Sequence, residues 1–340
     1  MPVKLGLIGL GYWGPNLLRN FQNTHYASVI ACADLDSQKI KKIAQKYPNI
    51  SFYKNYRKLL LEDLNAVIIA TPPSSHYEII KAALQSNKHV FVEKPVTTNY
   101  SQALEIAKIA QAKRKILMVD HIFVYSNAVE KIKGLIDKKK LGDLYYFDST
   151  RVNLGLLQSN TSVLWDLASH DVSILEYLIN DRPLSIHCVG SSHTLSRQED
   201  IAFVTIKYPG NFIAHINVNW LAPSKIRRIV VAGSKKMVVY DEASVEEKVK
   251  IIEKGISELT GHHRHEVLTN YRIGDSISPY LPARETLVDV CAHFINCILK
   301  NRRPITNGFS GARVVKILEK AEFSLISGMT YKFSTADFKI

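Results

Sequence analysis

Two patterns alternate along the first third of the chain. Short apolar runs rich in Val and Ile alternate with helical patterns from residue 3 to about residue 120. The runs show no polar alternation, which is typical of parallel strands covered on both faces. This rhythm predicts an α/β fold with a doubly wound parallel sheet over residues 1–120. The expected strands are Val3–Ile8, Val29–Ala33, Ala66–Ala70, His89–Val92 and Ile116–Val119, with helices at Trp13–Phe21, Ser37–Lys46, Ser74–Ser86 and Tyr100–Ala112.

The pattern changes after residue 120, and 340 residues exceed the usual size of a single core. Several later runs alternate in polarity and are joined by short turns, which predicts antiparallel pairing. We therefore expect a C-terminal α+β domain over residues 121–340 with an open, largely antiparallel sheet. Its expected strands are Leu144–Arg151, Ser185–Ser191, Ala202–Tyr208, Phe212–Trp220, Arg228–Ala232, Met237–Tyr240 and Val249–Ile252, its helices Asn127–Lys138, Val163–Ile179, Ala283–Leu299 and Ser310–Ser327, and its main loop Thr260–Pro282.

The formal net charge is +13, which is compatible with nucleic acid, a membrane surface or an anionic metabolite as partner. However, the densest basic run, Lys138 to Lys140, ends a predicted helix, where cations suit the helix dipole. No nucleic-acid-binding motif is recognisable, and no apolar stretch is long enough to span a bilayer. We expect neither nucleic acid nor a membrane among the partners.

Cysteine and histidine show no metal-ligand spacing. His262, His263 and His265 are almost adjacent and lack the i, i+4 spacing of a helical site. No cysteine belongs to a CxxC pair, and the N-terminus does not resemble a signal peptide. We therefore predict a cytoplasmic, metal-free protein whose four cysteines are reduced and mostly buried: Cys32, Cys188, Cys291 and Cys297.

A glycine-rich turn follows the first predicted strand and opens the first helix: Gly9-Leu10-Gly11-Tyr12-Trp13-Gly14. Gly9 permits the tight turn, Gly11 lets the backbone approach a pyrophosphate, and Gly14 permits close helix–strand packing. The helix N-terminus adds free N–H groups and positive potential. The turn, including Tyr12 and Trp13, therefore predicts a dinucleotide-binding site.

Asp34 ends the second predicted strand, twenty residues after Gly14. A carboxylate there accepts hydrogen bonds from both ribose hydroxyls and repels a 2′-phosphate, and Leu35 follows where a basic residue would favour that phosphate. NAD is therefore favoured over NADP. The alternative role of Asp34 is to cap the following helix.

Two further clusters follow predicted strands of the same sheet. The segment from Thr71 through Pro72 to His76 comes after Ala66–Ala70 and fits beside a dinucleotide, although a well-capped loop explains it equally well. Glu93 and Lys94 end the run that begins at His89. A lysine there can hydrogen-bond a substrate hydroxyl and stabilise the alkoxide formed as hydride departs; a surface ion pair is the alternative.

Asp166 and His170 are four residues apart on the predicted helix Val163–Ile179, so they share a helix face. The carboxylate can orient the imidazole and raise its basicity, which suits His170 to act as a general base. A histidine on a helix also serves structural purposes, but a polar pair beside Trp165 on an apolar helix favours function.

These motifs together resemble the Gfo/Idh/MocA oxidoreductases, named after glucose-fructose oxidoreductase and inositol dehydrogenase. The resemblance covers nearly the whole chain, and Glu93-Lys94-Pro95 is its most specific element. It implies a Rossmann domain, a catalytic Lys94, and His170 as proton acceptor with Asp166 as its partner. Thr161, Ser162 and Ala168 depart from the glycines common in the family near that helix.

The resemblance also implies the substrate class. The opening Gly-Tyr-Trp-Gly-Pro-Asn and the stretch Pro304–Gly308 look like the family's nucleotide-sugar branch, which includes enzymes similar to UDP-N-acetylglucosamine and UDP-N-acetylglucosaminuronate 3-dehydrogenases. It therefore implies hydride transfer between NAD and a secondary hydroxyl of a sugar or nucleotide sugar, bound in a cleft between the domains. Arg151 and Asn153 are candidate substrate contacts, with an exposed position on the sheet as the alternative.

Two other functions remain open from the sequence: a non-catalytic NAD(P)-binding sensor or corepressor with the same fold, and a dehydrogenase of inositol or a free sugar. Apolar residues on the open faces of the second sheet also predict a homo-oligomer, a dimer or a tetramer.

Overall fold

The computed structural model describes residues 2–155, 161–194, 198–256 and 271–338. The chain forms two compact units. The first unit contains residues 1–125 and 284–319, and the second contains residues 126–283 and 320–340. The units thus differ from the predicted domains, because residues 284–319 return to the first unit.

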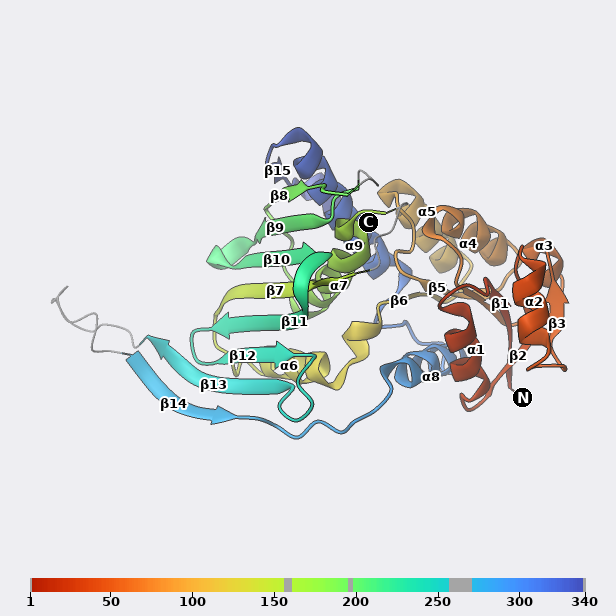
Figure 1. The fold of residues 1–340 in the computed structure, drawn as a ribbon, viewed down its shortest axis with the longest axis horizontal. Coiled ribbons are helices and arrows are strands. Elements are labelled where there is room, and N and C mark those ends of the chain that lie inside the picture. Colours follow the sequence, from red (N-terminus) through yellow and green to blue (C-terminus); the bar gives the residue numbers. More distant parts are fainter. Residues whose placement is uncertain (1, 156–160, 195–197, 257–270, 339–340) are drawn as a thin grey trace. The chain divides into compact units, whose positions relative to one another are not determined.

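The first unit is built on a six-stranded sheet with the order β3-β2-β1-β4-β5-β6 (Figure 1). Every neighbouring pair in it is parallel, which confirms the predicted doubly wound sheet. The edge strand β3 was not predicted, because its three residues contain no apolar run. The strands are β1 (Val3–Ile8), β2 (Ala27–Ala33), β3 (Ser51–Tyr53), β4 (Ala66–Ile69), β5 (His89–Glu93) and β6 (Leu117–Asp120).

Helices lie on both faces of this sheet (Figure 1). On one face α1 packs against α8, and on the other α4 packs against α5. The Phe294 ring of α8 lies 6.1 Å from Phe21 and 5.5 Å from Phe91, so the late helix completes the first core. The helices of this unit are α1 (Gly14–Gln22), α2 (Ser37–Ala44), α3 (Tyr56–Leu59), α4 (His76–Gln85), α5 (Tyr100–Ala112), α8 (Thr286–Leu299) and the start of α9 (Gly308–Ser327).

Helix α5 has the predicted bounds, and its sequence explains why. The Asn99 side chain accepts a hydrogen bond from the Gln102 N–H and caps the first turn. Apolar side chains then recur at helical spacing and are buried: Ala103, Ile106, Ala107 and Ala110. Local capping and one apolar stripe are therefore sufficient to define this helix.

The second unit is built on a nine-stranded sheet with the order β14-β13-β12-β11-β7-β10-β9-β8-β15. The β7–β10 pair is parallel and the other pairs are antiparallel, which confirms an open, largely antiparallel sheet. Its strands are β7 (Leu144–Leu154), β8 (Ser185–Ser191), β9 (Ile201–Lys207), β10 (Ile213–Asn219), β11 (Leu221–Gly233), β12 (Met237–Asp241), β13 (Val249–Ile256), β14 (Tyr271–Ile277) and β15 (Tyr331–Lys332).

Strand β14 corrects the predicted loop Thr260–Pro282. Residues 271–277 form an edge strand that pairs antiparallel with β13. The histidines His262, His263 and His265 lie outside the described residues. Within the described ranges, no group of three or more His, Cys, Asp or Glu side chains has a metal-binding arrangement.

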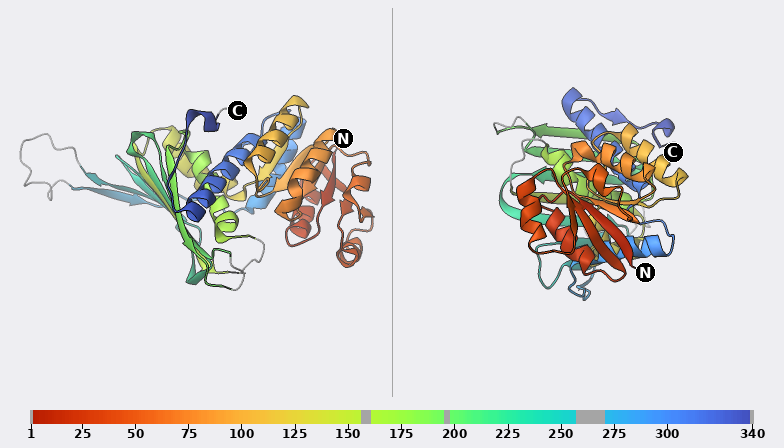
Figure 2. Two further views of the ribbon diagram at one scale, coloured as in Figure 1. Left: turned by 90° about the horizontal axis from the view of Figure 1, so that it is seen from above. Right: turned by 90° about the vertical axis from the view of Figure 1, so that its right-hand side faces the viewer.

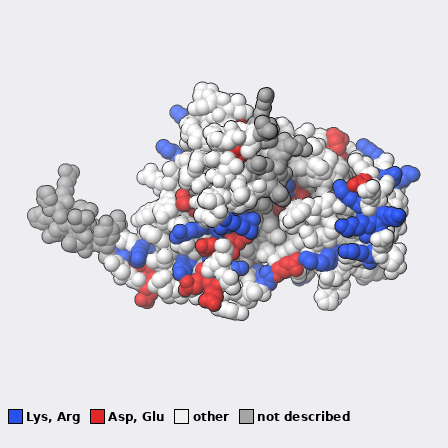
Figure 3. Space-filling model, viewed as in Figure 1, with Lys and Arg blue, Asp and Glu red and all other residues white. Residues whose placement is uncertain are grey.

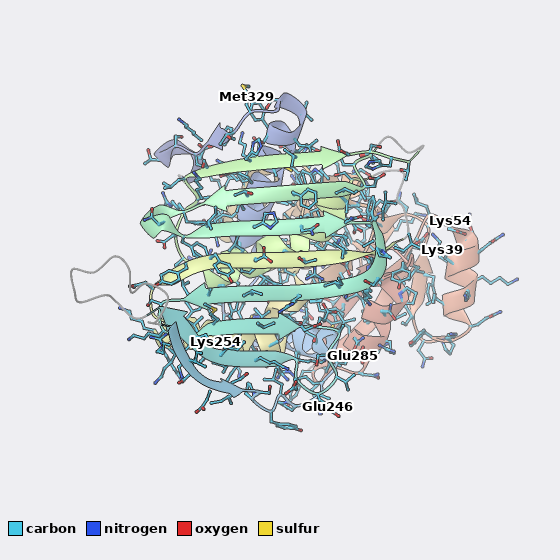
Figure 4. All side chains as sticks on the ribbon, turned by 60° about the vertical axis from the view of Figure 1, so that its left-hand side comes forward. Lys39, Lys54, Glu246, Lys254, Glu285 and Met329 are labelled. Carbon is cyan, nitrogen blue, oxygen red and sulfur yellow. The ribbon has the colours of Figure 1, made fainter. Side chains whose placement is uncertain are left out.

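Helices cover one face of the nine-stranded sheet (Figure 2). They are α6 (Asn127–Asp137), a π-helical turn η3 (Leu164–Ala168) that continues into α7 (Ser169–Leu178), and the end of α9. No described helix lies over the other face, which Figure 4 views directly. On β9, Ala202, Val204 and Ile206 are buried while Phe203 and Lys207 are exposed, so the strand alternates as predicted.

All four cysteines are buried, as predicted. Burial raises the pKa of Cys32 and of Cys188 to about 12, so both thiols stay protonated and unreactive. None of the described helices is both long and apolar enough to cross a membrane.

Candidate active site

The glycine turn lies where the strand order of the first sheet reverses. It follows β1, and the neighbouring strand β4 leads to Thr71. In an open parallel sheet the loops on either side of such a reversal diverge and leave a crevice beyond the carboxyl ends of the strands. The topology therefore puts both loops where dinucleotides bind.

The three glycines of the turn differ in the space that is available for a side chain. A Cβ on Gly9, at φ 99°, would lie 2.5 Å from the Ala70 carbonyl oxygen, and one on Gly14 would collide with the Gly9 carbonyl oxygen. The fold itself excludes side chains at these two positions. A side chain on Gly11 would meet nothing within 4 Å. The open space over Gly11 fits the close approach of a pyrophosphate.

Two aromatic residues of the turn remain accessible. Tyr12 is 82% exposed and Trp13 is 43% exposed, unlike the buried Leu10 beside them. Their rings pack edge to face with centroids 5.4 Å apart. Both predicted cofactor contacts therefore present an aromatic surface that a ligand can cover.

Asp34 stabilises the glycine turn through a hydrogen bond to its backbone. Its Oδ2 accepts a hydrogen bond of 2.6 Å from the Leu10 N–H, and its Oδ1 accepts one of 2.8 Å from the Asp36 N–H. Each carboxylate oxygen has a second acceptor site, so two ribose hydroxyls can still donate to Asp34. The alternative role of helix cap is wrong, because Asp36 is the residue that caps α2.

His76 is completely buried and joins two loops of the crevice. Its Nε2 lies 2.8 Å from the Thr71 carbonyl oxygen, and its Nδ1 lies 2.9 Å from that of Pro95. Burial lowers the pKa of His76, and the two backbone hydrogen bonds oppose this effect. Thr71 accepts a further hydrogen bond of 2.7 Å from the Ser75 hydroxyl. His76 thus links the loop after β4 to the segment that carries Lys94.

Charged and polar side chains gather where β5 and β6 end. Glu93 and Asp120 are register partners on these parallel strands, and Lys94 and His121 follow them. Glu93, Asp120 and His121 are at most 9% exposed. Among the described residues, Glu93 Oε1, Asp120 Oδ1 and both ring nitrogens of His121 have no hydrogen-bond partner. Buried polar atoms without partners are costly and mark sites where a ligand supplies the missing contacts.

Burial shifts the protonation of these groups. It raises the pKa of Asp120 to about 7, although the Lys94 charge opposes the shift. Burial, and then repulsion from Asp120, raises the pKa of Glu93 well above its usual range. Burial and the Lys94 charge lower the pKa of His121 to about 3. At neutral pH, His121 is therefore neutral, and both carboxyl groups bind protons more tightly than ordinary carboxyl groups do.

Asp120 and His121 did not emerge as candidates from the sequence. A charged pair directly after the apolar run Ile116–Val119 is the same signal that singled out Glu93 and Lys94. Only the pairing of β5 with β6 shows that Glu93 and Asp120 lie next to each other.

In the second unit, Asp166 lies in the π-helical turn η3 and His170 in the first turn of α7. The two side chains are therefore about one helical turn apart and both are partly exposed. Single π-helical turns are frequent at functional sites. The neighbouring Trp165 is held by a 2.9 Å hydrogen bond from its Nε1 to Glu322 on α9.

Arg151 is only 3% exposed, so the exposed position considered for it is wrong. Its Nε and Nη2 donate hydrogen bonds of 2.9 and 3.2 Å to the two carboxylate oxygens of Asp171, which is completely buried. Ser149 donates a third hydrogen bond to Asp171. This bidentate pair gives Arg151 a structural role, whereas Asn153 remains partly exposed.

Two family models match the chain. Residues 3–121 match an oxidoreductase family with an NAD-binding Rossmann fold, and residues 129–239 match the Gfo/Idh/MocA C-terminal domain. The chain belongs to the Gfo/Idh/MocA oxidoreductase family. Its first unit thus contains an NAD-binding Rossmann domain, as the glycine turn and Asp34 predicted.

Two relatives of this Gfo/Idh/MocA protein have names that state an activity. A 2,7-anhydro-N-acetylneuraminate hydratase of Escherichia coli is 24% identical over 259 residues, covering 70% of this chain and 68% of the relative. An inositol 2-dehydrogenase/D-chiro-inositol 3-dehydrogenase of Shouchella clausii is 25% identical, with coverage of 61% and 62%.

Solved structures share the fold over almost the whole length. UDP-N-acetylglucosamine 3-dehydrogenase from Acidithiobacillus ferrooxidans has a TM-score of 0.83 at 20% identity, covering 96% of this chain and 98% of its own. An Agrobacterium radiobacter oxidoreductase, crystallised with NAD+, L-tartaric acid and magnesium, has a TM-score of 0.82 at 15% identity and covers 98% of both chains.

Proposed function

We propose that this Gfo/Idh/MocA oxidoreductase transfers hydride between NAD and a secondary hydroxyl of a sugar or nucleotide sugar. The observation that carries the proposal is the cluster of Glu93, Asp120 and His121 beside Lys94, with its buried atoms that lack partners among the described residues. A domain that only holds a dinucleotide does not require titratable groups with such shifted pKa values.

Three residues carry the proposed chemistry. In the oxidation direction, His170 accepts the proton of the substrate hydroxyl, and Asp166 orients its imidazole. Lys94 donates a hydrogen bond to a substrate oxygen on which negative charge develops. His121, neutral at working pH, and the Glu93–Asp120 pair shape the electrostatic environment of Lys94. In reduction, the same groups act in reverse.

The cofactor is held by the first unit. The backbone around Gly11 receives the pyrophosphate, Asp34 accepts the ribose hydroxyls, and Tyr12 and Trp13 cover the exposed side. When bound, NAD supplies the acceptor or donor of the hydride. The loop that His76 anchors, from Thr71 and Pro72, completes the binding site.

Turnover by Lys94→Met and His170→Asn variants tests the assignment. We expect losses of about 100- to 1,000-fold for the lysine and about 100- to 10,000-fold for the histidine, the usual contributions of an oxyanion donor and a general base. The NADH dissociation constant of both variants should change by less than about threefold. Near wild-type turnover in either variant would refute its assigned role.

The substrate class is tested by following NADH absorbance with UDP-sugars, free sugars and inositols. A nucleotide sugar is favoured because the chain carries a net charge of +13, which raises the local concentration of anionic substrates. Turnover with inositol or a free sugar, and none with a UDP-sugar, would assign the protein to the alternative dehydrogenase class.

A second candidate function is a sensor or corepressor that binds NAD(P) without catalysis. Tight NADH binding without turnover of any substrate would favour it. A cofactor that stays bound and is recycled would give the same result, so a 2-oxo acid acceptor is included as a separate arm. Turnover only with that acceptor supports the enzyme and excludes the sensor.

We also propose that the chain forms a homo-oligomer through the open face of the nine-stranded sheet. Apolar side chains on this face, including Tyr146, Phe203, Ile213 and Ile226, are 37–40% exposed, and Figure 4 shows the face without a covering helix among the described residues. A Phe203→Glu variant should shift the mass measured by light scattering towards the monomer. A wild-type protein that is already monomeric contradicts the proposal.

A further inference from the structure

A pocket of about 210 Å³ lies in the first unit, where β6 begins. Its lining comes from the end of α5, the first residues of β6, and the connection between α8 and α9. Four of its side chains are cationic and none is acidic: Arg114, Lys115, Arg302 and Arg303. Two short segments far apart in sequence, 113–115 and 300–303, thus bring like charges together.

These four cations have no carboxylate partner among the described residues, whereas several other cations of the first unit do. Lys4 pairs with Asp63, Arg19 with Glu285 and Lys81 with Glu105. The pocket charges also act on neighbouring groups. Lys115 contributes to lowering the pKa of His89, after burial, and Arg302 opposes the burial that raises the pKa of Cys297.

Helix dipoles do not balance this charge. The C-termini of α5 and α8 lie next to the pocket cations in sequence, and each contributes about half a negative charge. The N-terminus of α9 begins within the lining, at Gly308, and contributes about half a positive charge. About half a negative charge therefore faces four positive ones, so the pocket keeps a strong positive potential.

The pocket is separate from the cofactor site of the same unit. Ile116 and Leu117 of its lining lie at the amino end of β6, whereas Asp120 ends that strand. The glycine turn and Lys94 follow the carboxyl ends of their parallel strands. The pocket therefore lies at the amino ends of the parallel strands, and the cofactor site lies at their carboxyl ends.

We propose that this pocket binds a phosphate or diphosphate group as a second anion site. Guanidinium groups bind phosphate oxygens through charge-assisted hydrogen bonds, and Arg114 and Arg302 are exposed and available. Arg303 is already oriented, since it donates a 3.0 Å hydrogen bond to Asn307 Oδ1. The volume is below the range of about 300–1,000 Å³ typical of drug-sized ligands, which suits a phosphate group rather than a whole dinucleotide.

Calorimetric titration of the full chain with inorganic diphosphate tests the proposal. The protein is first saturated with NADH, so that the pyrophosphate site of the glycine turn is occupied. We expect saturable binding that an Arg114→Gln/Arg302→Gln variant weakens by at least about tenfold, the loss of one or two charge-assisted contacts. The assay does not require turnover, so its outcome is independent of the proposed reaction.

A Lys41→Gln/Lys42→Gln variant is the matched control. It removes the same charge from α2, which contributes no residue to the pocket lining. Figure 3 shows that Lys and Arg side chains also gather elsewhere on the surface. We expect less than about a twofold change from this pair. Equal weakening by both variants would mean diffuse attraction to a basic surface and would overturn the proposal, as would the absence of saturable binding to the wild type.

A parallel titration with UDP distinguishes two sources of the anion. Tighter binding of UDP than of diphosphate, lost in the Arg114→Gln/Arg302→Gln variant, supports a nucleotide ligand. Equal affinity supports a free anion. In either case diphosphate should slow amide hydrogen exchange in residues 114–117 and 301–309, and protection confined to other segments would contradict the site.

Discussion

Each unit buries charged side chains, but in different ways. In the second unit, both oxygens of Asp171 accept hydrogen bonds from Arg151, and Ser149 donates another. In the first unit, Glu93 and Asp120 are almost as deeply buried, yet each has a carboxylate oxygen without a partner among the described residues. Burial alone therefore does not identify a functional charge.

The difference lies in whether the fold supplies the counter-groups. A buried pair with good geometry roughly offsets its own desolvation and keeps the fold specific. A buried carboxyl with one oxygen that lacks a partner costs free energy that folding does not recover, which indicates a function. Arg151 therefore stabilises the fold, whereas Asp120 is a candidate for a functional role.

The largest effect on the free energy of unfolding is expected from breaking the Arg151–Asp171 ion pair. An Asp171→Ala variant leaves the Arg151 guanidinium buried without its main partner, which should cost about 3–5 kcal/mol in the free energy of unfolding. In a Trp13→Phe background, tryptophan fluorescence comes only from Trp165 and Trp220 of the second unit, so urea unfolding followed by selective tryptophan excitation measures that unit.

The double variant Asp171→Ala/Arg151→Met provides the control for this pair. Removing both charges should recover part of the loss, because no uncompensated ion remains. If Asp171→Ala costs less than about 1 kcal/mol, a value typical of exposed pairs, the pair is not the structural element described here.

Replacing Asp120, whose Oδ1 has no hydrogen-bond partner among the described residues, should change the stability in the opposite direction. Folding raises the pKa of Asp120 from 3.8 to about 7, so between these values the folded chain binds more protons than the unfolded chain. Stability therefore falls as the pH rises through this interval. An Asp120→Asn variant should lose part of that dependence and be more stable than the wild type above pH 7, by about 1–3 kcal/mol.

Melting temperatures of the cofactor-free proteins between pH 4 and pH 8 measure this difference. Asp63→Asn is the control, because Lys4 lowers the pKa of the exposed Asp63 and its small contribution has the opposite sign. Parallel melting curves for wild type and Asp120→Asn would show that Asp120 does not titrate as described.

The glycine turn offers a smaller effect that separates fold from ligand binding. A methyl group on Gly14 would collide with the Gly9 carbonyl oxygen, so Gly14→Ala should destabilise the first unit by about 1–3 kcal/mol. Gly11→Ala meets no protein atom within 4 Å and should leave the melting temperature nearly unchanged. It should nevertheless weaken NADH binding by about tenfold or more, since only the cofactor needs that space. Unchanged NADH affinity would contradict a cofactor at Gly11.

The smallest effect is expected at the surface. The Lys4–Asp63 pair measures 2.6 Å, but Asp63 is 88% exposed. An Asp63→Ala change should therefore alter chemical unfolding very little, within the range of typical exposed pairs. If Asp63→Ala lowered the free energy of unfolding as much as Asp171→Ala does, the ion pair alone would determine the loss, whether or not it is buried.

Local sequence alone determined the parallel sheet, the bounds of α5, and the glycine turn with Asp34. Strand and helix periodicity, capping residues and turn chemistry act over a few residues, so they can be identified without tertiary contacts. The strand β3 and the edge strand β14 could not be identified in this way, because β3 has only three residues and β14 shows no run of apolar residues.

Only the tertiary structure decided what those segments do together. Residues 284–319 joined the first unit because the apolar face of α8, through Phe294, completes a core begun near Phe21. The pairing of β5 with β6 brings Asp120 next to Glu93. Asp36, rather than Asp34, caps α2. These outcomes depend on burial and pairing between residues distant in sequence, which no local pattern encodes.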